Sequence, residues 1–266
     1  MKNNRYKILV LSDLKNSEST LLKSSVGLAK MIDGEVKLFH VKKHIDIVKR
    51  ENQFSAMRSL NEEHNNTKKQ IDNLVETFSR NYGLKISGNY AFGKIKEEIQ
   101  QQIELYNPDV IVLGQRDASS FQLIGDSVTR FILKKFKGIV MIASNKNALE
   151  PDKKMTLAML NGSRKIFNTG LSKALMTHTA TPLKSFKIIS SQNEETEVSD
   201  VMEDKVIEYK FEQNDNALTT LSSYLIKSNI NLLCVDRNEK QKKNTQEMPL
   251  YEVVNKINVS VLVSEA

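Results

Sequence analysis

The chain has 266 residues, of which 39% are hydrophobic and 27% are charged, and this is enough for two domains that each bury a core. Its single cysteine, Cys234, excludes an internal disulfide and a thiolate metal cluster, and no apolar run reaches the roughly 18 to 20 residues that span a bilayer. The net charge of +7 arises within residues 1–150, but the basic residues there are scattered among acidic ones without interleaved aromatic residues, so we expect neither a nucleic-acid nor a membrane partner.

The first half of the chain alternates apolar runs with helical stripes. We predict strands over residues 7–11, 36–41, 86–92, 110–113 and 139–143. Between them, apolar residues at helical spacing predict helices within 21–32, 57–78, 95–106 and 128–136. Strands that are apolar throughout and alternate with helices are typical of a parallel sheet covered on both faces, so the predicted fold class is α/β.

The second half repeats this plan after a polar stretch, residues 145–154. Strands are predicted over 155–160, 186–189, 206–211, 232–235 and 259–263, with helices within 167–175 and 217–226. Residues 231–239 align with 109–117 without a gap, whereas the long second helix has no counterpart and an acidic segment, 194–204, takes its place. We therefore predict two tandem, doubly wound parallel-sheet domains, 1–146 and 153–266, of which the second is smaller.

The stretch 107–143 carries the clearest functional pattern. An apolar strand ends at Gly114, a polar loop follows, and Gly125 precedes Ser127 at the expected start of a helix. Glycines let backbone N–H groups approach a phosphate, and a helix N-terminus adds further donors and a positive dipole end. A strand, a glycine loop and a helix in this order indicate a nucleotide-phosphate site.

Several short motifs together resemble those of the universal stress protein family. They are a first strand that ends at Asp13, a second strand that ends in His40-Val41, the glycines Gly93 and Gly114, Ser127-Val128-Thr129 before the last helix, and a Val-x-Val closing strand within 259–263. The resemblance covers the whole chain and implies a stress-response regulatory protein with the adenine-nucleotide alpha-hydrolase-like fold. Family members pair through their last strands, so the two halves are expected to form an intramolecular pseudo-dimer. Whether the last strands also join two chains into a homodimer is left open.

The resemblance also implies the residues that would bind adenine nucleotide, ATP or AMP with Mg²⁺, in the first domain. Asp13 and Val41 would contact the ribose and the adenine. The phosphates would lie against Gly114, Gly125, Ser127 and Val128. Judged from the residues alone, Asp13 fits the N-cap of the first helix equally well, and Val41 fits an ordinary strand end.

Two aspartates depart from the family's phosphate loop. Asp117 stands at the second glycine position, and Asp126 takes the place of either the third glycine or the serine, depending on the register. Two negative charges about 4 Å apart repel by roughly 1 kcal/mol in water, although Mg²⁺ could bridge a carboxylate and a phosphate. The second domain departs further, because Asp236 aligns with Gly114. Asn161 there takes the place of Asp13, so no phosphate loop is expected.

Two functional hypotheses follow. The first is a stress-response regulator that binds ATP or AMP weakly in its first domain, with at most slow, incidental ATP hydrolysis. The second is a protein-interaction module that binds no nucleotide and recruits an unknown partner through the pseudo-dimer surface. No catalytic or metal-binding residues are predicted, because the serines lack a G-x-S-x-G elbow and the histidines lack zinc-ligand spacing. The N-terminus enters a strand without a signal-peptide pattern, so we expect a cytoplasmic location.

Overall fold

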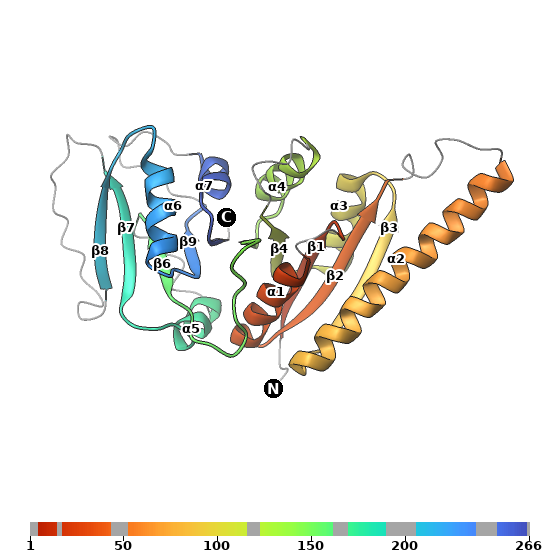
Figure 1. Cartoon of the computed structure of the whole chain (residues 1–266), viewed down its shortest axis with the longest axis horizontal. Helices are drawn as coiled ribbons and strands as arrows, with labels where there is room; N and C mark the ends of the chain where they lie inside the picture. Colours follow the sequence, from red (N-terminus) through yellow and green to blue (C-terminus); the bar gives the residue numbers. More distant parts are fainter. Residues whose placement is uncertain are drawn as a thin grey trace.

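The computed structural model describes residues 5–14, 18–43, 53–115, 123–161, 170–189, 206–237 and 249–264. Within these ranges ten strands form one sheet, in the order β3-β2-β1-β4-β5-β10-β9-β6-β7-β8 (Figure 1). Their bounds are β1 Tyr6–Ser12, β2 Gly34–Lys42, β3 Ile86–Phe92, β4 Val110–Gly114, β5 Ile139–Ala143, β6 Leu157–Leu160, β7 Leu183–Ile189, β8 Val206–Glu212, β9 Leu232–Val235 and β10 Ser260–Val263. Neighbouring strands are parallel except for β5 and β10, which confirms the predicted α/β class.

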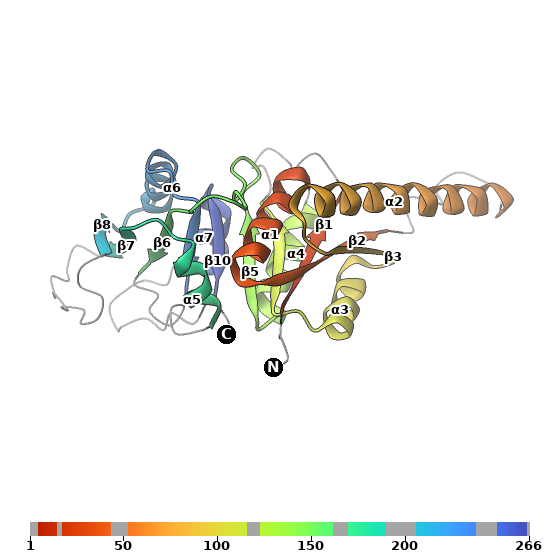
Figure 2. The same ribbon diagram turned by 90° about the horizontal axis from the view of Figure 1, so that it is seen from below.

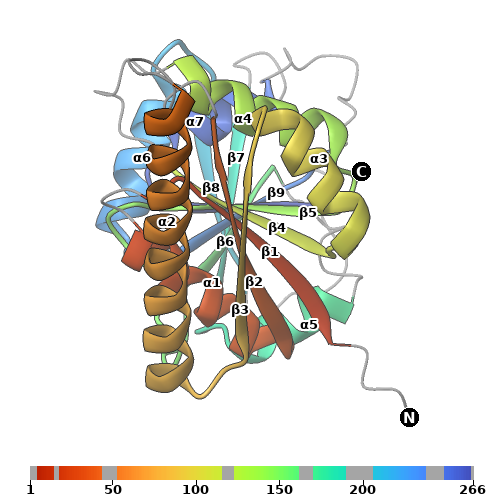
Figure 3. The ribbon, with the colours of Figure 1, turned by 90° about the vertical axis from the view of Figure 1, so that its right-hand side faces the viewer.

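Helices cover both faces of this sheet. One face carries α1 (Glu18–Ile32), α2 (Gln53–Tyr82) and α5 (Gly170–Thr177), which share one apolar core with the sheet. The other face carries α3 (Ile95–Tyr106), α4 (Leu123–Lys135), α6 (Ala217–Lys227) and α7 (Leu250–Lys256), which enclose a second core. Figure 3 shows α2 and α3 on opposite sides of β1, β2 and β3, with each strand rotated against the next, as strand sterics favour. No helix in the described part of the chain is both long and apolar enough to cross a bilayer.

β5 and β10 meet in antiparallel orientation in the middle of the sheet. Met141 lies opposite Leu262, and the pairs on either side are Val140 with Val263 and Ile142 with Val261. Outward from this central pair, the strand order in one half repeats the order in the other (Figure 2). A half-turn about the central pair therefore relates each strand of one half to one strand of the other.

The hydrogen-bonded ladders extend this relation to single residues. Val112 on β4 and Cys234 on β9 lie beside the two members of the central pair, so they correspond to each other. Two residues further along each strand, Gly114 corresponds to Asp236. The structure thus places an aspartate in the second half at the position of the glycine that ends β4.

The same ladders correct the alignment at the end of the first strand. Val10 lies beside Val112 and Met159 beside Cys234, so Ser12 corresponds to Asn161. The sequence comparison had placed Asn161 at the position of Asp13, which is wrong by one residue. The counterpart of Asp13 is residue 162, which lies outside the described residues. Comparing the two halves by sequence does not define which residues correspond near the end of a strand. A ladder of backbone hydrogen bonds sets that register directly.

Two helices differ from the predictions. α4 begins at Leu123, before the expected start at residue 128, so the glycine at 125 lies within its first turn. A single glycine weakens a helix by about 1 kcal/mol without ending it. α7 was not predicted, because its seven residues are too few for a periodic stripe; it is held by the buried side chains of Val253 and Val254.

The long helix α2 lies directly on the edge strand β3. A Cβ atom at Gly88 would come within 2.3 Å of the Ile71 Cγ2 atom, so the glycine permits this close approach. The ring centroid of His64 on α2 lies 4.0 Å from that of Phe92 at the end of β3. Figure 1 shows that the N-terminal part of α2 extends past the end of β3. The contacts of α2 with β3 named here, at His64 and Ile71, lie on the part of the helix that is alongside the strand.

The corresponding face of the second half is polar. Glu208 on β8 stands where β3 has Gly88, and its carboxylate pairs with the Lys187 ammonium at 2.7 Å. A charged, solvated face of this kind does not need a covering helix. The acidic segment 194–204, which the sequence comparison set in place of the missing helix, lies outside the described residues.

The stretch between the halves is packed on α1. Leu149 is buried, and its backbone N–H donates to the Ser24 hydroxyl at 3.1 Å. Ion pairs flank it on α1, from Lys23 to Glu150 and from Lys30 to Asp152. The connection is therefore part of the folded body.

Candidate functional site

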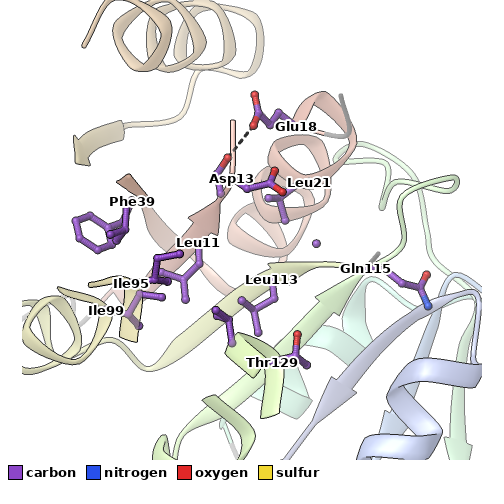
Figure 4. Close-up of a pocket in the computed structure, with 14 residues that line it drawn as sticks. Leu11, Asp13, Glu18, Leu21, Phe39, Ile95, Ile99, Leu113, Gln115 and Thr129 are labelled. Atoms are coloured by element: carbon purple, nitrogen blue, oxygen red, sulfur yellow. Dashed lines mark hydrogen bonds between the residues drawn. The ribbon is translucent and has the colours of Figure 1, made fainter. Parts of the chain in front are cut away.

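A pocket of about 120 Å³ opens at the carboxyl ends of β1, β2 and β4 (Figure 4). The strand order reverses between β1 and β4: the chain passes from β1 outward to β2 and β3, and then crosses back to β4. In open α/β sheets, ligands bind at the carboxyl ends of the strands at such a reversal. The pocket is smaller than the roughly 300 to 1,000 Å³ usual for whole ligands, so it fits a ring system whose remainder extends outside.

The inner wall of the pocket is apolar. Strand ends contribute Leu11, Phe39 and Leu113, and α3 contributes Ile95 and Ile99. Figure 4 shows Leu11 beside the two isoleucines, with Leu113 across the pocket from them. Aliphatic walls of this kind accommodate a flat heterocycle without requiring charged partners.

The mouth of the pocket carries polar groups from the segment that joins β1 to α1. Asp13 is exposed there, and Glu18 is the first residue of α1. The Ser12 hydroxyl donates to Glu18 Oε1 at 3.0 Å, a bond drawn dashed in Figure 4, and accepts the Leu14 N–H at 3.0 Å. Leu14 has a φ of 55°, a left-handed conformation that reverses the chain after the strand. This arrangement holds both carboxylates at one end of the pocket.

His40 stabilises the end of β1 from the neighbouring strand. Its Nδ1–H donates to the Ser12 carbonyl oxygen at 2.9 Å, and the residue is buried. Burial lowers the pKa of His40, and the nearby Lys42 lowers it further, whereas the bond to Ser12 acts in the opposite direction. His40 is the last residue of β2 that pairs with β1, and β2 continues for two more residues to Lys42. β1 therefore ends before β2 does, directly before Asp13.

Four of the six predicted site residues lie together. Asp13, Val41, Gly114 and Val128 all line the pocket. Ser127 is half-buried in α4 and does not line it. The prediction that Ser127 opens the helix is wrong, since the helix begins at Leu123. Only the first four N–H groups of a helix lack partners within it, and the fifth residue lies beyond them.

Gly125, the sixth predicted residue, lies in the first turn of α4. Asp117 lies outside the described residues, and the side chain of Asp126 is likewise not described. The repulsion expected from these two aspartates therefore stays a prediction.

Gly114 borders the open space of the pocket. A Cβ atom built there would meet only the Leu21 Cδ2 atom, at 3.8 Å, which is ordinary contact. The glycine is therefore not required by packing. It leaves the backbone at the end of β4 open to a ligand.

Sequence analysis missed several residues that shape the site. Glu18 and Leu21 come from α1, Thr129 from α4, and Gln115 follows Gly114. Of these four residues, Glu18 could have been found from the sequence. An acidic residue in the first turn of the first helix lies close to the end of the first strand. The other three are placed by packing between elements.

Among the described residues, the equivalent region of the second half carries a cluster of aromatic rings. Phe186 corresponds to Phe39, and its ring lies 5.3 Å from Tyr209, 6.1 Å from Phe211 and 5.8 Å from Tyr224. The phenylalanine on β8 stands where β3 has Ala91, beside Val41. Aromatic rings on β8 thus stand where the edge strand of the first half has Asn89 and Ala91.

The ends of β4 and β9 reach across to the opposite half. The Gln115 amide donates to the Ile257 carbonyl at the end of α7, and in Figure 4 its side chain points away from the pocket toward the second half. Its counterpart, Arg237, donates to the Phe136 carbonyl and, at 2.9 Å, to the Gly138 carbonyl after α4. Each half therefore caps the last helix of the other.

The described residues contain no group of three His, Cys, Asp or Glu side chains that could hold a metal ion. Cys234 is fully buried in β9, and burial raises the pKa of its thiol to about 12. A thiol in that state is inert. Binding, through an apolar slot with a polar mouth, is what this arrangement supports.

Comparison with known proteins identifies the family and the fold. The family model described as "Universal stress protein family" matches residues 5–144, just over half of the chain. No curated protein matches the chain in sequence. A universal stress protein from Archaeoglobus fulgidus DSM 4304 is similar in structure, with a TM-score of 0.70 and 16% identity over 97% of this chain and 96% of that one.

A functionally unknown protein from Pseudomonas aeruginosa PAO1 is also similar, with a TM-score of 0.58 and 12% identity over 98% of this chain and 92% of that one. At these identities the structural likeness concerns the fold. Both matches extend over nearly the full length of the chain, so the fold likeness includes the second half.

Proposed function

The chain belongs to the universal stress protein family, and from this premise we propose that it is a stress-response regulatory protein whose first half binds an adenine nucleotide weakly. The observation that carries the proposal is the pocket at the reversal of strand order, around which Asp13, Val41, Gly114 and Val128 converge. The adenine fits the apolar slot, and the Asp13 carboxylate can accept hydrogen bonds from ribose hydroxyls. Phosphates would extend past Gly114, toward the loop that precedes α4.

The phosphates contribute little to affinity in this proposal. Ser127 and Val128 lie beyond the free N–H groups of α4, so the helix does not offer them as anion donors. Mg²⁺, when bound with ATP, would neutralise part of the phosphate charge. No side-chain arrangement for general acid–base or nucleophilic catalysis surrounds the described part of the pocket, so we propose binding without efficient turnover.

We further propose that residues 1–146 and 153–266 act as tandem domains in an intramolecular pseudo-dimer. The antiparallel pairing of β5 with β10 supports this arrangement. Each of these strands has a strand on both sides, and the edges of the sheet are β3 and β8. A homodimer built through the last strands would therefore need this internal pairing to open.

Calorimetric titration of the full chain with ATP and Mg²⁺ tests the nucleotide site, after the protein has been checked for carried-over nucleotide. We expect one site per chain with weak affinity, and an Asp13→Ala variant that binds at least about tenfold more weakly because it loses the ribose contact, a difference of about 1.4 kcal/mol. Asp72→Ala, which removes an exposed aspartate from α2, is the matched control and should bind as the wild type does. Absence of heat at millimolar ATP, with no carried-over nucleotide, would contradict the proposal and favour a protein-interaction module.

A further inference from the structure

β8 forms one edge of the described sheet, at the end of the molecule away from β3 (Figure 1). All seven of its residues pair in parallel with residues of β7, so the strand carries no bulge. Side chains on both of its faces are exposed, among them Val206 with 37% and Ile207 with 43% of their surface. A regular edge strand with exposed hydrophobic side chains is where a sheet can accept a further strand.

The sequence of β8, Val-Ile-Glu-Tyr-Lys-Phe-Glu, is complementary to itself in one antiparallel register. When two copies pair about a twofold axis at Tyr209, Glu208 of each copy lies opposite Lys210 of the other. These charges stand on one face of the strand, and on the other face Ile207 lies opposite Phe211. Opposite charges and apolar side chains directly across from each other stabilise a pair of strands.

The other registers of this pair are unfavourable. A shift by two residues places Glu208 opposite Glu208 in one direction and Lys210 opposite Lys210 in the other. A shift by one residue would put the charged face of one copy beside the apolar face of the other. Like charges directly opposite each other destabilise a pair of strands, which is how charged edge strands avoid chance pairing. The alternation of charge in β8 therefore favours a single register.

The charged face of β8 would gain a missing partner in this arrangement. The Glu208 carboxylate contacts the Lys187 ammonium of β7 at 2.7 Å. Lys187 lies beside Lys210 in the ladder, and within the described residues Lys210 makes no ion pair. A carboxylate from a second copy would therefore add a negative charge where two lysines are neighbours.

The apolar face of β8 is already held in place. The ring of Tyr209 lies 5.3 Å from that of Phe186 on β7 and 5.3 Å from that of Tyr224 on α6. Side chains that are fixed before association lose little conformational entropy when a partner binds. Ile207, on the same face, would be covered by Phe211 of the second copy.

We propose that β8 is a homodimer interface, in which the β8 strands of two copies of this chain pair in antiparallel orientation about Tyr209. This pairing joins two ten-stranded sheets with the strand orientation that β5 and β10 have inside each chain. The other edge, β3, contains no charged residue and offers no such match. Stable complexes bury more than about 1,000 Å² in total, and one pair of strands is a small contact, so the dimer is weak. The inference does not depend on the nucleotide site.

Sedimentation equilibrium of the full chain, from about 1 µM to about 1 mM, measures this association. Glu208→Lys and Lys210→Glu each place like charges opposite one another, so either variant alone should dimerise at least about tenfold more weakly than the wild type. An equimolar mixture of the two variants should regain the association, because each then meets the opposite charge on the other. Lys96→Glu, which makes the same charge change at an exposed position on α3, is the matched control and should behave as the wild type.

A disulfide across the twofold axis tests the register. In a Tyr209→Cys variant the two introduced thiols lie opposite each other, with Cα atoms about 4.5 to 5.5 Å apart, which a disulfide can span. In Val206→Cys, the control on the same strand, they lie about 20 Å apart. Cys234 is fully buried and does not compete. Under oxidation we expect a cross-linked dimer from Tyr209→Cys alone.

Three results would overturn the proposal. A wild-type chain that stays monomeric over the whole concentration range would favour another occupant of this edge, either residues 190–205 of the same chain or a different protein. A dimer that neither charge variant weakens would place the contact elsewhere on the molecule. Failure of the mixed variants to associate, or cross-linking of Val206→Cys as readily as of Tyr209→Cys, would contradict the register.

Discussion

The two halves of this chain share one strand order and one ladder register, yet only the first has the described pocket at its strand ends. In the first half β4 ends at Gly114, which borders open space, whereas β9 is followed by Asp236, whose Oδ1 accepts the Ser264 hydroxyl proton at 3.1 Å. The end of β1 lines the pocket with Leu11, Ser12 and Asp13 and is held by the His40 ring of β2. After β6, the Asn161 side chain accepts the Ile188 N–H at 3.0 Å and ties the strand end to β7.

The edge strands β3 and β8 also differ at a single corresponding position. Gly88 lets α2 approach β3, while Glu208 keeps the equivalent face of β8 in water. The comparison teaches that the strand core sets the architecture, and that within the described residues the halves differ at single residues of the strand ends and edges. Exchanging these residues between the halves tests that conclusion.

The largest effect is expected when Gly88 is replaced by Glu, which copies the edge strand of the second half into the first. The new side chain would meet Ile71 and bury a carboxylate under α2. We expect a loss of more than about 3 kcal/mol in the free energy of unfolding, measured by urea denaturation. The reverse change, Glu208→Gly, removes one surface ion pair and should cost less than about 1 kcal/mol. Equal losses from both changes would contradict the distinction between covered and solvated faces.

The next effect concerns the reciprocal contacts across the centre. Arg237→Ala removes charge-assisted hydrogen bonds to two carbonyl groups after α4, so we expect a loss of about 2 kcal/mol in unfolding free energy. Gln115→Ala removes one neutral bond and should cost about 1 kcal/mol. Denaturation curves of the two variants measured in parallel test this order. A larger loss for Gln115→Ala would show that the two halves do not hold each other in this way.

Gly114→Asp copies the strand end of the second half into the first. The new Cβ atom finds only ordinary contact, so stability should change by less than about 1 kcal/mol, while the carboxylate enters the pocket. We expect nucleotide binding to weaken at least about tenfold, or about 1.4 kcal/mol, in calorimetric titration. Asp236→Gly should not create a second binding site, because Tyr209 and Phe211 stand where β3 has Asn89 and Ala91. Unchanged binding in Gly114→Asp would place the ligand elsewhere.

The smallest expected effect is a difference in pH dependence. The pKa of His40 lies below its ordinary value of 6.5 in the folded chain, chiefly because of burial. As the pH falls below about 6.5 the unfolded chain binds a proton that the folded chain resists, so stability is full above this pH and declines below it. We expect His40→Gln, which keeps an N–H donor, to reduce this decline by up to about 1 kcal/mol between pH 6.5 and 5.5. If the urea midpoint changes with pH equally in the wild type and in His40→Gln, this expected pH dependence is contradicted.

His40 also bears on the comparison of the halves, because its counterpart on β7 is Lys187. A lysine does not titrate between pH 5 and 7. Variants of Lys187 should therefore leave the same pH profile unchanged, which makes Lys187→Gln the matched control.

Much of the fold could be predicted from hydrophobic periodicity. The strands at 86–92 and 139–143 and the helix at 95–106 have the predicted bounds, because each is a local pattern bounded by its own stop signals. α7 and the start of α4 were missed, since short helices depend on what they pack against. Of the residues that line the candidate pocket, Asp13, Val41 and Gly114 at strand ends were named from the sequence, whereas Glu18 and Gln115 were not.

The amino-acid order of this chain was thus sufficient to define an α/β fold with a repeated plan, its family, and the strand ends that line the candidate pocket. Periodicity and strand-end motifs are local, and they survive when the register is unknown. The correspondence of Ser12 with Asn161, the pairing of β5 with β10 and the contact of Gln115 with the end of α7 were decided by the tertiary structure. They depend on hydrogen-bonded ladders and packing between segments far apart in the sequence, and no local pattern records those contacts.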